Sequence, residues 1–168
     1  MINTKDATDV KQIDWELWEA DKYAVITYIF SGDSVLLMHK KRGLGKGKVN
    51  APGGHIESGE TELEAAIRET EEEVGLTPLN MEEVGTLYFQ FTNGLKMKGT
   101  VFTAESSRGI LTETDEADPF WVSISDIPYT KMWEDDLLWL PHVIKGKKIE
   151  GRFIFDDDKM LSYSLDII

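Results

Sequence analysis

The segment from Thr61 to Gly75 constrains the fold of this chain more than any other part of the sequence. Thr61 and Glu64 have the spacing of a capping box, in which each side chain accepts a hydrogen bond from the backbone N–H of the other. Gly75 is a residue type that commonly ends helices, because it adopts the left-handed conformation at little cost. Five residues between them recur at helical spacing, namely Leu63, Ala66, Ile67, Thr70 and Val74. The sequence therefore predicts an amphipathic helix over 61–74 with one face on a core.

Strand-like segments surround this helix. The β-rich segments 23–30 and 34–38, separated by the turn Ser31-Gly32-Asp33, predict a hairpin. Further strands are predicted at 84–92, 98–105, 119–124, 150–155 and 160–166, and further helices at 4–21 and 134–145. The turn residues Ser107-Arg108-Gly109 are expected to close one of these strands. A mixed sheet with two or three helices corresponds to the α+β class.

Charge and composition exclude several kinds of partner. The 168 residues carry 18 Lys and Arg against 31 Asp and Glu, a formal net charge of -13. A net acidic chain is not expected to bind a nucleic-acid polymer or an anionic membrane. The absence of cysteine excludes disulfides, zinc-thiolate sites and cysteine nucleophiles. The first twenty residues hold no apolar run of signal-peptide length, so a cytoplasmic location is expected.

Acidic residues are concentrated in the segment 57–73, which contains eight glutamates and a single basic residue, Arg68. A solvated helix face is the ordinary explanation of such a run. However, Glu69, Glu72 and Glu73 stand at i, i+3 and i+4, so their carboxylates are expected to converge on one patch. Hard divalent cations prefer oxygen ligands of this kind, and without Cys or His companions Mg²⁺ or Mn²⁺ fits better than zinc.

The same segment matches a known pattern. Gly54, Glu60 and the run from Arg68 to Leu76 fit G-x5-E-x7-R-E-x-x-E-E-x-G-L. This resembles the Nudix box, the loop–helix–loop signature of the Nudix hydrolases. Thr70 stands where the family usually has an aliphatic residue, and its hydroxyl is expected to bond to the Ala66 carbonyl. The resemblance implies the Nudix fold, an α/β/α sandwich with a mixed sheet between helices, over residues 22–168. Residues 1–21 are expected to form a separate N-terminal helical extension.

The resemblance also implies a reaction and a set of metal ligands. Nudix hydrolases cleave nucleoside diphosphates linked to another group, using Mg²⁺ ions in an in-line displacement. The implied ligands are Glu69, Glu72, Glu73 and the Gly53 carbonyl, with Glu116 as a further ligand or the general base. Arg68 would pair with a glutamate of the box and orient it, and Glu60 would support the loop, or the metal cluster at a distance.

Segments outside the box are similar to the MutT-like branch of the family, which hydrolyses oxidised purine nucleoside triphosphates such as 8-oxo-dGTP to the monophosphate and pyrophosphate. The similar segments are 40–50, 132–141 and 151–163. The implied substrate contacts are Asn50, Asp135 and Asp136 at the polar edge of the purine, Trp133 stacked on the base, and Phe89 and Leu44 lining the pocket. Lys40 is expected to contact phosphate on a different ground, as part of the basic loop beside the metal site. Ala24 stands where this branch has a threonine, so one polar contact is missing.

Two groups of residues can also be judged by their own chemistry. Asp135 and Asp136 lie among large apolar residues, so one of them is expected to hold a proton near neutral pH and donate to a purine edge. The alternative is a surface pair that caps the helix beginning there. The basic loop 40–48 holds five of the 18 basic residues, which either contact phosphate or only raise solubility. Trp121 and Trp139 are predicted to be core residues.

The leading interpretation is an enzyme acting on a small nucleotide, present as a monomer or homodimer. A Nudix hydrolase of another substrate remains an alternative, such as dGTP, a nucleotide sugar, a dinucleoside polyphosphate or an RNA cap. A non-catalytic nucleotide sensor on the same scaffold is a third possibility, against which the complete set of glutamates weighs.

Overall fold

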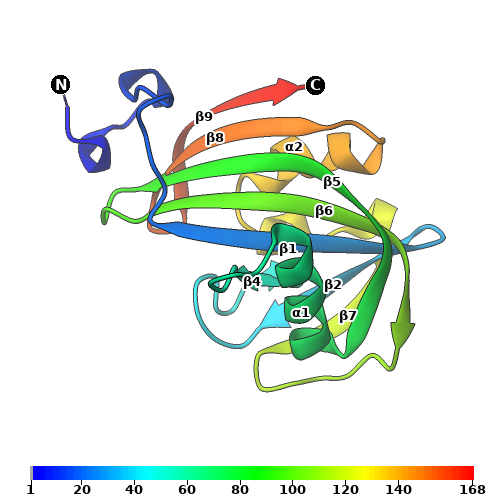
Figure 1. The fold of residues 1–168 in the computed structure, drawn as a ribbon. Helices are drawn as coiled ribbons and strands as arrows, with labels where there is room; N and C mark the ends of the chain where they lie inside the picture. The colour runs from blue at the N-terminus through cyan, green and yellow to red at the C-terminus, as the bar shows by residue number, and fades with distance from the viewer. Residues whose placement is uncertain (1) are drawn as a thin grey trace. The chain divides into compact units, whose positions relative to one another are not determined.

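The computed structural model describes residues 2–168, which form nine strands, two α-helices and four short 3-10 helices (Figure 1). In chain order the elements are η1 (Thr4–Asp6), η2 (Val10–Gln12), β1 (Lys22–Ser31), β2 (Ser34–Lys40), β3 (Val49–Asn50), β4 (Gly53–His55), α1 (Glu62–Val74), β5 (Leu76–Phe91), β6 (Lys96–Gly109), β7 (Ala117–Ser123), η3 (Ile124–Asp126), η4 (Tyr129–Lys131), α2 (Asp136–Ile144), β8 (Ile149–Asp156) and β9 (Lys159–Ile167). Strands β5 and β8 pair in parallel, whereas β1 with β2 and β8 with β9 are antiparallel. The predicted α+β class with a mixed sheet is therefore confirmed.

The chain divides into two compact units. The first comprises the chain up to Tyr23, Val84–Thr100 and Glu134–Ile168; the second comprises Ala24–Glu83 and Val101–Trp133. Strands β1, β5 and β6 contribute residues to both units. Neither α-helix of residues 2–168 has the length and apolar character that crossing a bilayer requires.

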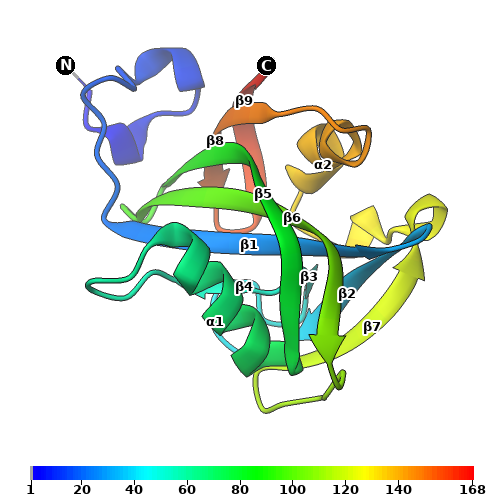
Figure 2. The ribbon, with the colours of Figure 1, turned by 45° about the vertical axis from the view of Figure 1, so that its right-hand side comes forward.

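The second unit is built on the predicted hairpin of β1 and β2, which is confirmed by the pairing of Phe30 with Val35. Strand β4 pairs with β1, and β7 runs along the whole of β2 (Figure 2). The two core clusters of this unit contain Ile29, Leu36, Met38, Val74, Leu76, Ala104 and Ala117, and Val25, Ala65, Ala66 and Phe102. Helix α1 contributes Val74 to one cluster and both alanines to the other, so its apolar face is fixed against strands.

Helix α1 begins and ends where the sequence predicts. Thr61 Oγ1 accepts from the Glu64 N–H at 3.1 Å and Glu64 Oε1 accepts from the Thr61 N–H at 3.0 Å. Gly75 adopts φ +79° at the C-terminus. The buried face differs from the predicted stripe: Leu63 is 45% exposed and Ile67 is only partly buried, while Ala65 and Glu73, which lie outside the stripe, are buried at 0% and 2% exposure. The helix thus buries a carboxylate near its last turn, a cost that calls for a compensating partner.

The first unit contains the parallel pair of β5 and β8, with β9 antiparallel on the far side of β8 (Figure 1). Helix α2 contacts β8 and β9. It continues through Pro141, at which the sequence predicts an interruption or a kink. Trp139 is fully buried, as predicted.

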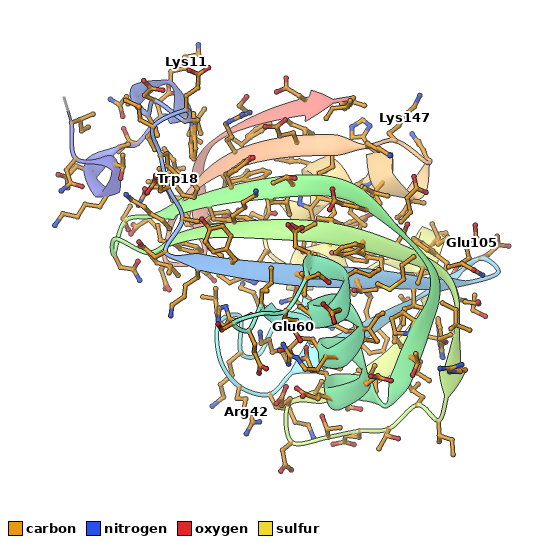
Figure 3. The ribbon with its side chains drawn as sticks, viewed as in Figure 1. Lys11, Trp18, Arg42, Glu60, Glu105 and Lys147 are labelled. Carbon is orange, nitrogen blue, oxygen red and sulfur yellow. The ribbon has the colours of Figure 1, made fainter. Side chains whose placement is uncertain are left out.

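The predicted helix over 4–21 is wrong. The segment forms two single-turn 3-10 helices, of which η2 has a capping box between Asp9 and Gln12. Side chains that bond to nearby backbone groups in this way compete with a continuous helix. The segment is instead held by distant partners in its own unit: Trp18 Nε1 donates to buried Gln90 Oε1 at 2.9 Å, and the Val10 N–H donates to Ser162 Oγ at 3.0 Å. Figure 3 labels Trp18 in this segment.

Three smaller predictions also need correction. Strand β5 begins at Leu76 rather than at 84. Strand β6 continues to Gly109, through the residues expected to form a turn. Trp121, predicted to be a core residue, is 39% exposed on β7, where it pairs with Leu36 of β2.

Candidate active site

Glu73 is the buried carboxylate at the centre of the candidate site. Its Oε1 accepts a hydrogen bond from the Gly53 N–H at 2.9 Å, which joins α1 to β4. A Cβ atom at Gly53 would lie 2.2 Å from the Val25 carbonyl oxygen, so only glycine allows this approach of β4 to β1. Burial raises the pKa of Glu73 to about 8, while the Gly53 N–H and the charge of Lys40 act in the opposite direction.

Glu69 lies one turn earlier on α1 and faces Gly54. A Cβ atom at Gly54 would come within 2.3 Å of the Glu69 carboxyl carbon, so the glycine leaves the space that this carboxylate fills. Burial raises the pKa of Glu69, and Arg68 partly offsets that rise. Gly54 therefore makes room for the carboxylate of Glu69, while Gly53 donates its N–H to that of Glu73.

Glu116 reaches the same place from the loop between β6 and β7. The Thr114 hydroxyl donates to the Glu73 carbonyl at 2.8 Å and accepts from the Glu116 N–H at 3.2 Å. On the other side of the loop, the Lys41 N–H donates to the Glu116 carbonyl at 2.9 Å. The loop is thus fixed to both α1 and the end of β2.

These three glutamates form a cluster that could hold a metal ion. One carboxylate oxygen from each of Glu69, Glu73 and Glu116 lies within 4.8 Å of the others. The donor set fits a hard divalent cation, since such ions take carboxylate oxygens and would offset the unfavourable burial of several negative groups. Glu72, predicted to converge with Glu69 and Glu73, is not part of this cluster; its side chain is 53% exposed and pairs with Arg68 at 3.2 Å.

Arg68 pairs with glutamates of the motif, as predicted. Its Nε and Nη2 donate to the two oxygens of Glu60 at 2.7 and 2.9 Å, and its Nη1 donates to Glu69 Oε1 at 2.8 Å. The hydrogen bonds from Arg68 lower the pKa of Glu60 to about 2. Glu60, labelled in Figure 3, also accepts from the Glu57 N–H at 3.0 Å, so it supports the loop before α1. The expected hydroxyl bond of Thr70 to the Ala66 carbonyl is present at 2.7 Å.

The basic loop is bound to carboxylates beside the cluster. Arg42 Nη2 donates to Glu116 Oε1 at 2.8 Å, and Lys41 pairs with Glu113 and donates to the Thr114 carbonyl at 2.8 Å. These pairings join positions more than seventy residues apart, and no local pattern in the sequence indicated them. Thr114 was likewise missed, since a threonine in a loop carries no signal of the bonds that it makes.

Several predicted substrate residues of the second unit lie near one another. Gly45 packs against Trp133 and Asn50, because a Cβ atom there would be 2.8 Å from Trp133 Nε1 and 3.4 Å from Asn50 Nδ2. The ammonium group of Lys48 lies 5.3 Å from the centroid of the Trp133 ring. Leu44 is 45% exposed. The glycine-rich loop therefore positions the indole predicted to stack on a base.

The remaining predicted residues, Asp135, Asp136 and Phe89, belong to the first unit. Both aspartates are buried, and Asp135 makes no capping bond to α2, which argues against the alternative of a surface cap. Asp135 Oδ2 accepts from Trp139 Nε1 at 2.8 Å. Burial raises the pKa of Asp135 to about 6, in the predicted direction. Phe89 stacks on Phe153 with ring centroids 5.4 Å apart.

The mixed sheet, the capped helix α1 and the three clustered glutamates are the features by which this chain can be compared with known protein families. The chain belongs to the NUDIX domain family, whose model matches residues 21–143. A protein from Danio rerio named oxidized purine nucleoside triphosphate hydrolase is 37% identical over 147 residues, which are 86% of this chain and 94% of the relative. The protein of the same name from Mus musculus is 37% identical over 142 residues, 83% of this chain and 91% of the relative. Among solved structures, a MutT protein from Bacillus halodurans is 29% identical with a TM-score of 0.79, covering 86% of this chain and 97% of that one.

Proposed function

We propose that this protein hydrolyses oxidised purine nucleoside triphosphates, such as 8-oxo-dGTP, to the monophosphate and pyrophosphate with Mg²⁺, or with Mn²⁺ in its place. The observation that carries this proposal is the cluster of Glu69, Glu73 and Glu116 on a NUDIX domain. The names of the relatives from Danio rerio and Mus musculus support the substrate class. The activity would remove damaged nucleotides before a polymerase uses them.

The carboxylates of Glu69, Glu73 and Glu116 would hold the ion, with the carbonyl of Gly53 as a further ligand. Glu72 would join them only by leaving Arg68, with which it pairs at 3.2 Å. A bound divalent cation supplies charge neutralisation for the phosphates and a water of lowered pKa. Arg68 would keep Glu69 oriented, since it holds that carboxylate while Glu60 fixes the guanidinium. Glu116 would serve either as a ligand or as the general base.

Six residues would contact the purine base. Trp133 would stack on the base and Asn50 would hydrogen-bond to it, with Leu44 and Phe89 as apolar contacts. Asp135 and Asp136 would bond to the polar edge, where a protonated carboxyl donates and an ionised one accepts. Lys40 would contact phosphate, which its influence on the pKa of Glu73 supports, because it places the ammonium charge close to the carboxylate cluster.

A panel of substrates tests the proposal. We expect kcat/KM with Mg²⁺ to be highest for 8-oxo-dGTP when it is compared with 2-hydroxy-dATP, dGTP and a nucleotide sugar, and we expect EDTA to abolish turnover. Preference for dGTP or the nucleotide sugar would favour another Nudix substrate. Nucleotide binding without turnover of any member would instead indicate a sensor. A cytoplasmic location and a monomeric or homodimeric state remain part of the proposal.

A further inference from the structure

Arg42 is bound to a residue of the carboxylate cluster rather than pointing freely to solvent. Its Nη2 lies 2.8 Å from Glu116 Oε1, and its side chain is 64% exposed while that of Glu116 is 34% exposed. Ion pairs at such exposed positions are weak, because water and salt compete with both partners. Arg42 can therefore leave Glu116 at little cost.

Lys41, the preceding residue, is held differently. It pairs with Glu113 and also donates to the Thr114 carbonyl at 2.8 Å, and neither partner belongs to the carboxylate cluster. Two adjacent cations of the basic loop thus have different partners: Lys41 fixes the backbone of the loop that carries Glu116, whereas Arg42 occupies the carboxylate itself.

The Glu116 oxygen that Arg42 holds can serve either Arg42 or a divalent cation. Arg68 stays on Glu69 because Glu60 also binds its guanidinium, whereas the described residues give Arg42 no second carboxylate. A carboxylate oxygen of Glu116 lies within 4.8 Å of those of Glu69 and Glu73, so an ion held by the three would stand close to the guanidinium of Arg42 and repel it. In the absence of an ion, Arg42 instead reduces the repulsion among the three carboxylates. Arg42 would thus neutralise Glu116 in the metal-free protein, and the divalent cation would neutralise it in the metal-bound protein.

We propose that Arg42 occupies Glu116 while no divalent cation is bound and transfers to the phosphates of the nucleotide once the ion takes that carboxylate. This inference rests on the proposed function for the identity of the anion. Guanidinium groups bind phosphate through two parallel N–H bonds, so the released side chain finds a better partner in the substrate than in water. Binding of the ion would then prepare the basic loop for the triphosphate.

The first part of the proposal is that Arg42 competes with a divalent cation for Glu116. It is tested by titrating the protein with Mn²⁺ alone and measuring free Mn²⁺ by electron paramagnetic resonance. Because an exposed ion pair is worth at most about 1 kcal/mol, we expect Arg42→Gln to tighten Mn²⁺ binding by about two- to fivefold. Lys46→Gln removes a charge from an exposed side chain of the same loop that makes no bond to Glu116, and it should change the affinity by less than about 1.5-fold. In a Glu116→Gln background, Arg42→Gln should have no effect on Mn²⁺ affinity. Equal shifts for the two loop variants, or a shift that persists without Glu116, would overturn the competition.

The second part of the proposal is that Arg42 moves to the phosphates of the nucleotide. It is tested by measuring, by calorimetry at saturating Mg²⁺, the affinity for a dGTP analogue whose α and β phosphorus atoms are joined by an imido group. Arg42→Gln should weaken its binding about tenfold, because a charge-assisted bidentate contact is lost. Binding equal to that of the unaltered protein would show that Arg42 does not transfer to phosphate. The Mn²⁺ titrations need no turnover, so they keep their meaning even if no nucleotide of the panel is hydrolysed.

Discussion

The hydroxyl of Thr114 donates to the backbone carbonyl of Glu73 at an O–O distance of 2.8 Å. The same hydroxyl accepts from the Glu116 N–H, so one side chain connects two segments that bring carboxylates to the cluster. Because both partners are backbone groups, the connection fixes the separation of the two segments whichever rotamers the glutamates adopt. Thr114 is therefore a positioning residue, with no contact to substrate required.

Replacement of Thr114 by valine should loosen this connection. We expect Mn²⁺ affinity and kcat to fall by about tenfold each, the lower end of what loss of a supporting bond costs a metal site. Stability should fall by about 1–3 kcal/mol, the net value of the two hydrogen bonds lost. Thr114→Ser should restore all three. Thr112→Val offers a matched control, because that hydroxyl bonds only to the nearby Ile110 carbonyl; an equal loss of affinity there would remove the special role of Thr114.

Glu73→Gln should abolish turnover without lowering the stability of the metal-free protein. Burial raises the pKa of Glu73 to about 8, so the ionised form is costly in the metal-free protein. We expect the variant to unfold in EDTA at the same or higher urea concentration than the unaltered protein, while Mg²⁺-dependent turnover is lost. Glu71→Gln, on the exposed side of the same helix, should retain turnover. Full turnover by Glu73→Gln would contradict the assignment of Glu73 as a metal ligand.

The pH dependence of stability should report on Asp135. Its pKa is raised from 3.8 to about 6, so the folded state binds this proton more tightly than the unfolded state. Stability from this group is therefore fully present below pH 4 and is lost as the pH rises through about 6; two pKa units correspond to about 3 kcal/mol. Asp135→Asn keeps an acceptor for Trp139 and should reduce the slope of urea unfolding between pH 4 and 7, while the contribution of Glu73, whose pKa is about 8, remains. Asp157→Asn should leave the slope unchanged, and an equally unchanged slope in Asp135→Asn would refute a buried, titrating Asp135.

Asp136→Asn should reduce discrimination between purines. The substitution replaces a carboxyl by an amide with a fixed donor and acceptor, so the ratio of kcat/KM for 8-oxo-dGTP over dGTP should change by tenfold or more. Asp157→Asn, in the acidic turn between β8 and β9, should leave the ratio unchanged. If both variants hydrolysed 8-oxo-dGTP at the unaltered rate, the predicted role of Asp136 would be wrong.

Helix α1 could be predicted from the sequence because its determinants are local. The capping box of Thr61 and Glu64 and the stop at Gly75 act over three or four residues, and each is present in the structure. The N-terminal segment, residues 4–21, has an apolar spacing almost as regular as that of α1, yet it forms only two short 3-10 helices. Its indoles pack on Tyr88, and Trp18 bonds to Gln90, so tertiary contacts override the local pattern.

The candidate site could be predicted only in part. Glu69 and Glu73 share a helix, so their proximity follows from helical spacing. Glu72 has the same spacing, but it pairs with Arg68 on the exposed side. Glu116 could be predicted only from the family resemblance. Its position beside Glu69 and Glu73 depends on the pairing of β2 with β7 and on Thr114, which lies 41 residues from its partner Glu73.

The anchoring of the N-terminal segment has a practical consequence for anyone who shortens this protein. The matched family range, 21–143, suggests a minimal fragment that begins near residue 21 and ends after α2. Such a fragment would lack β8, the parallel neighbour of β5, and would leave an unpaired strand edge. It would also uncover Tyr88, on which Trp15 and Trp18 rest. We expect the trimmed fragment to precipitate on expression, whereas residues 2–168 together have no such open edge at β5.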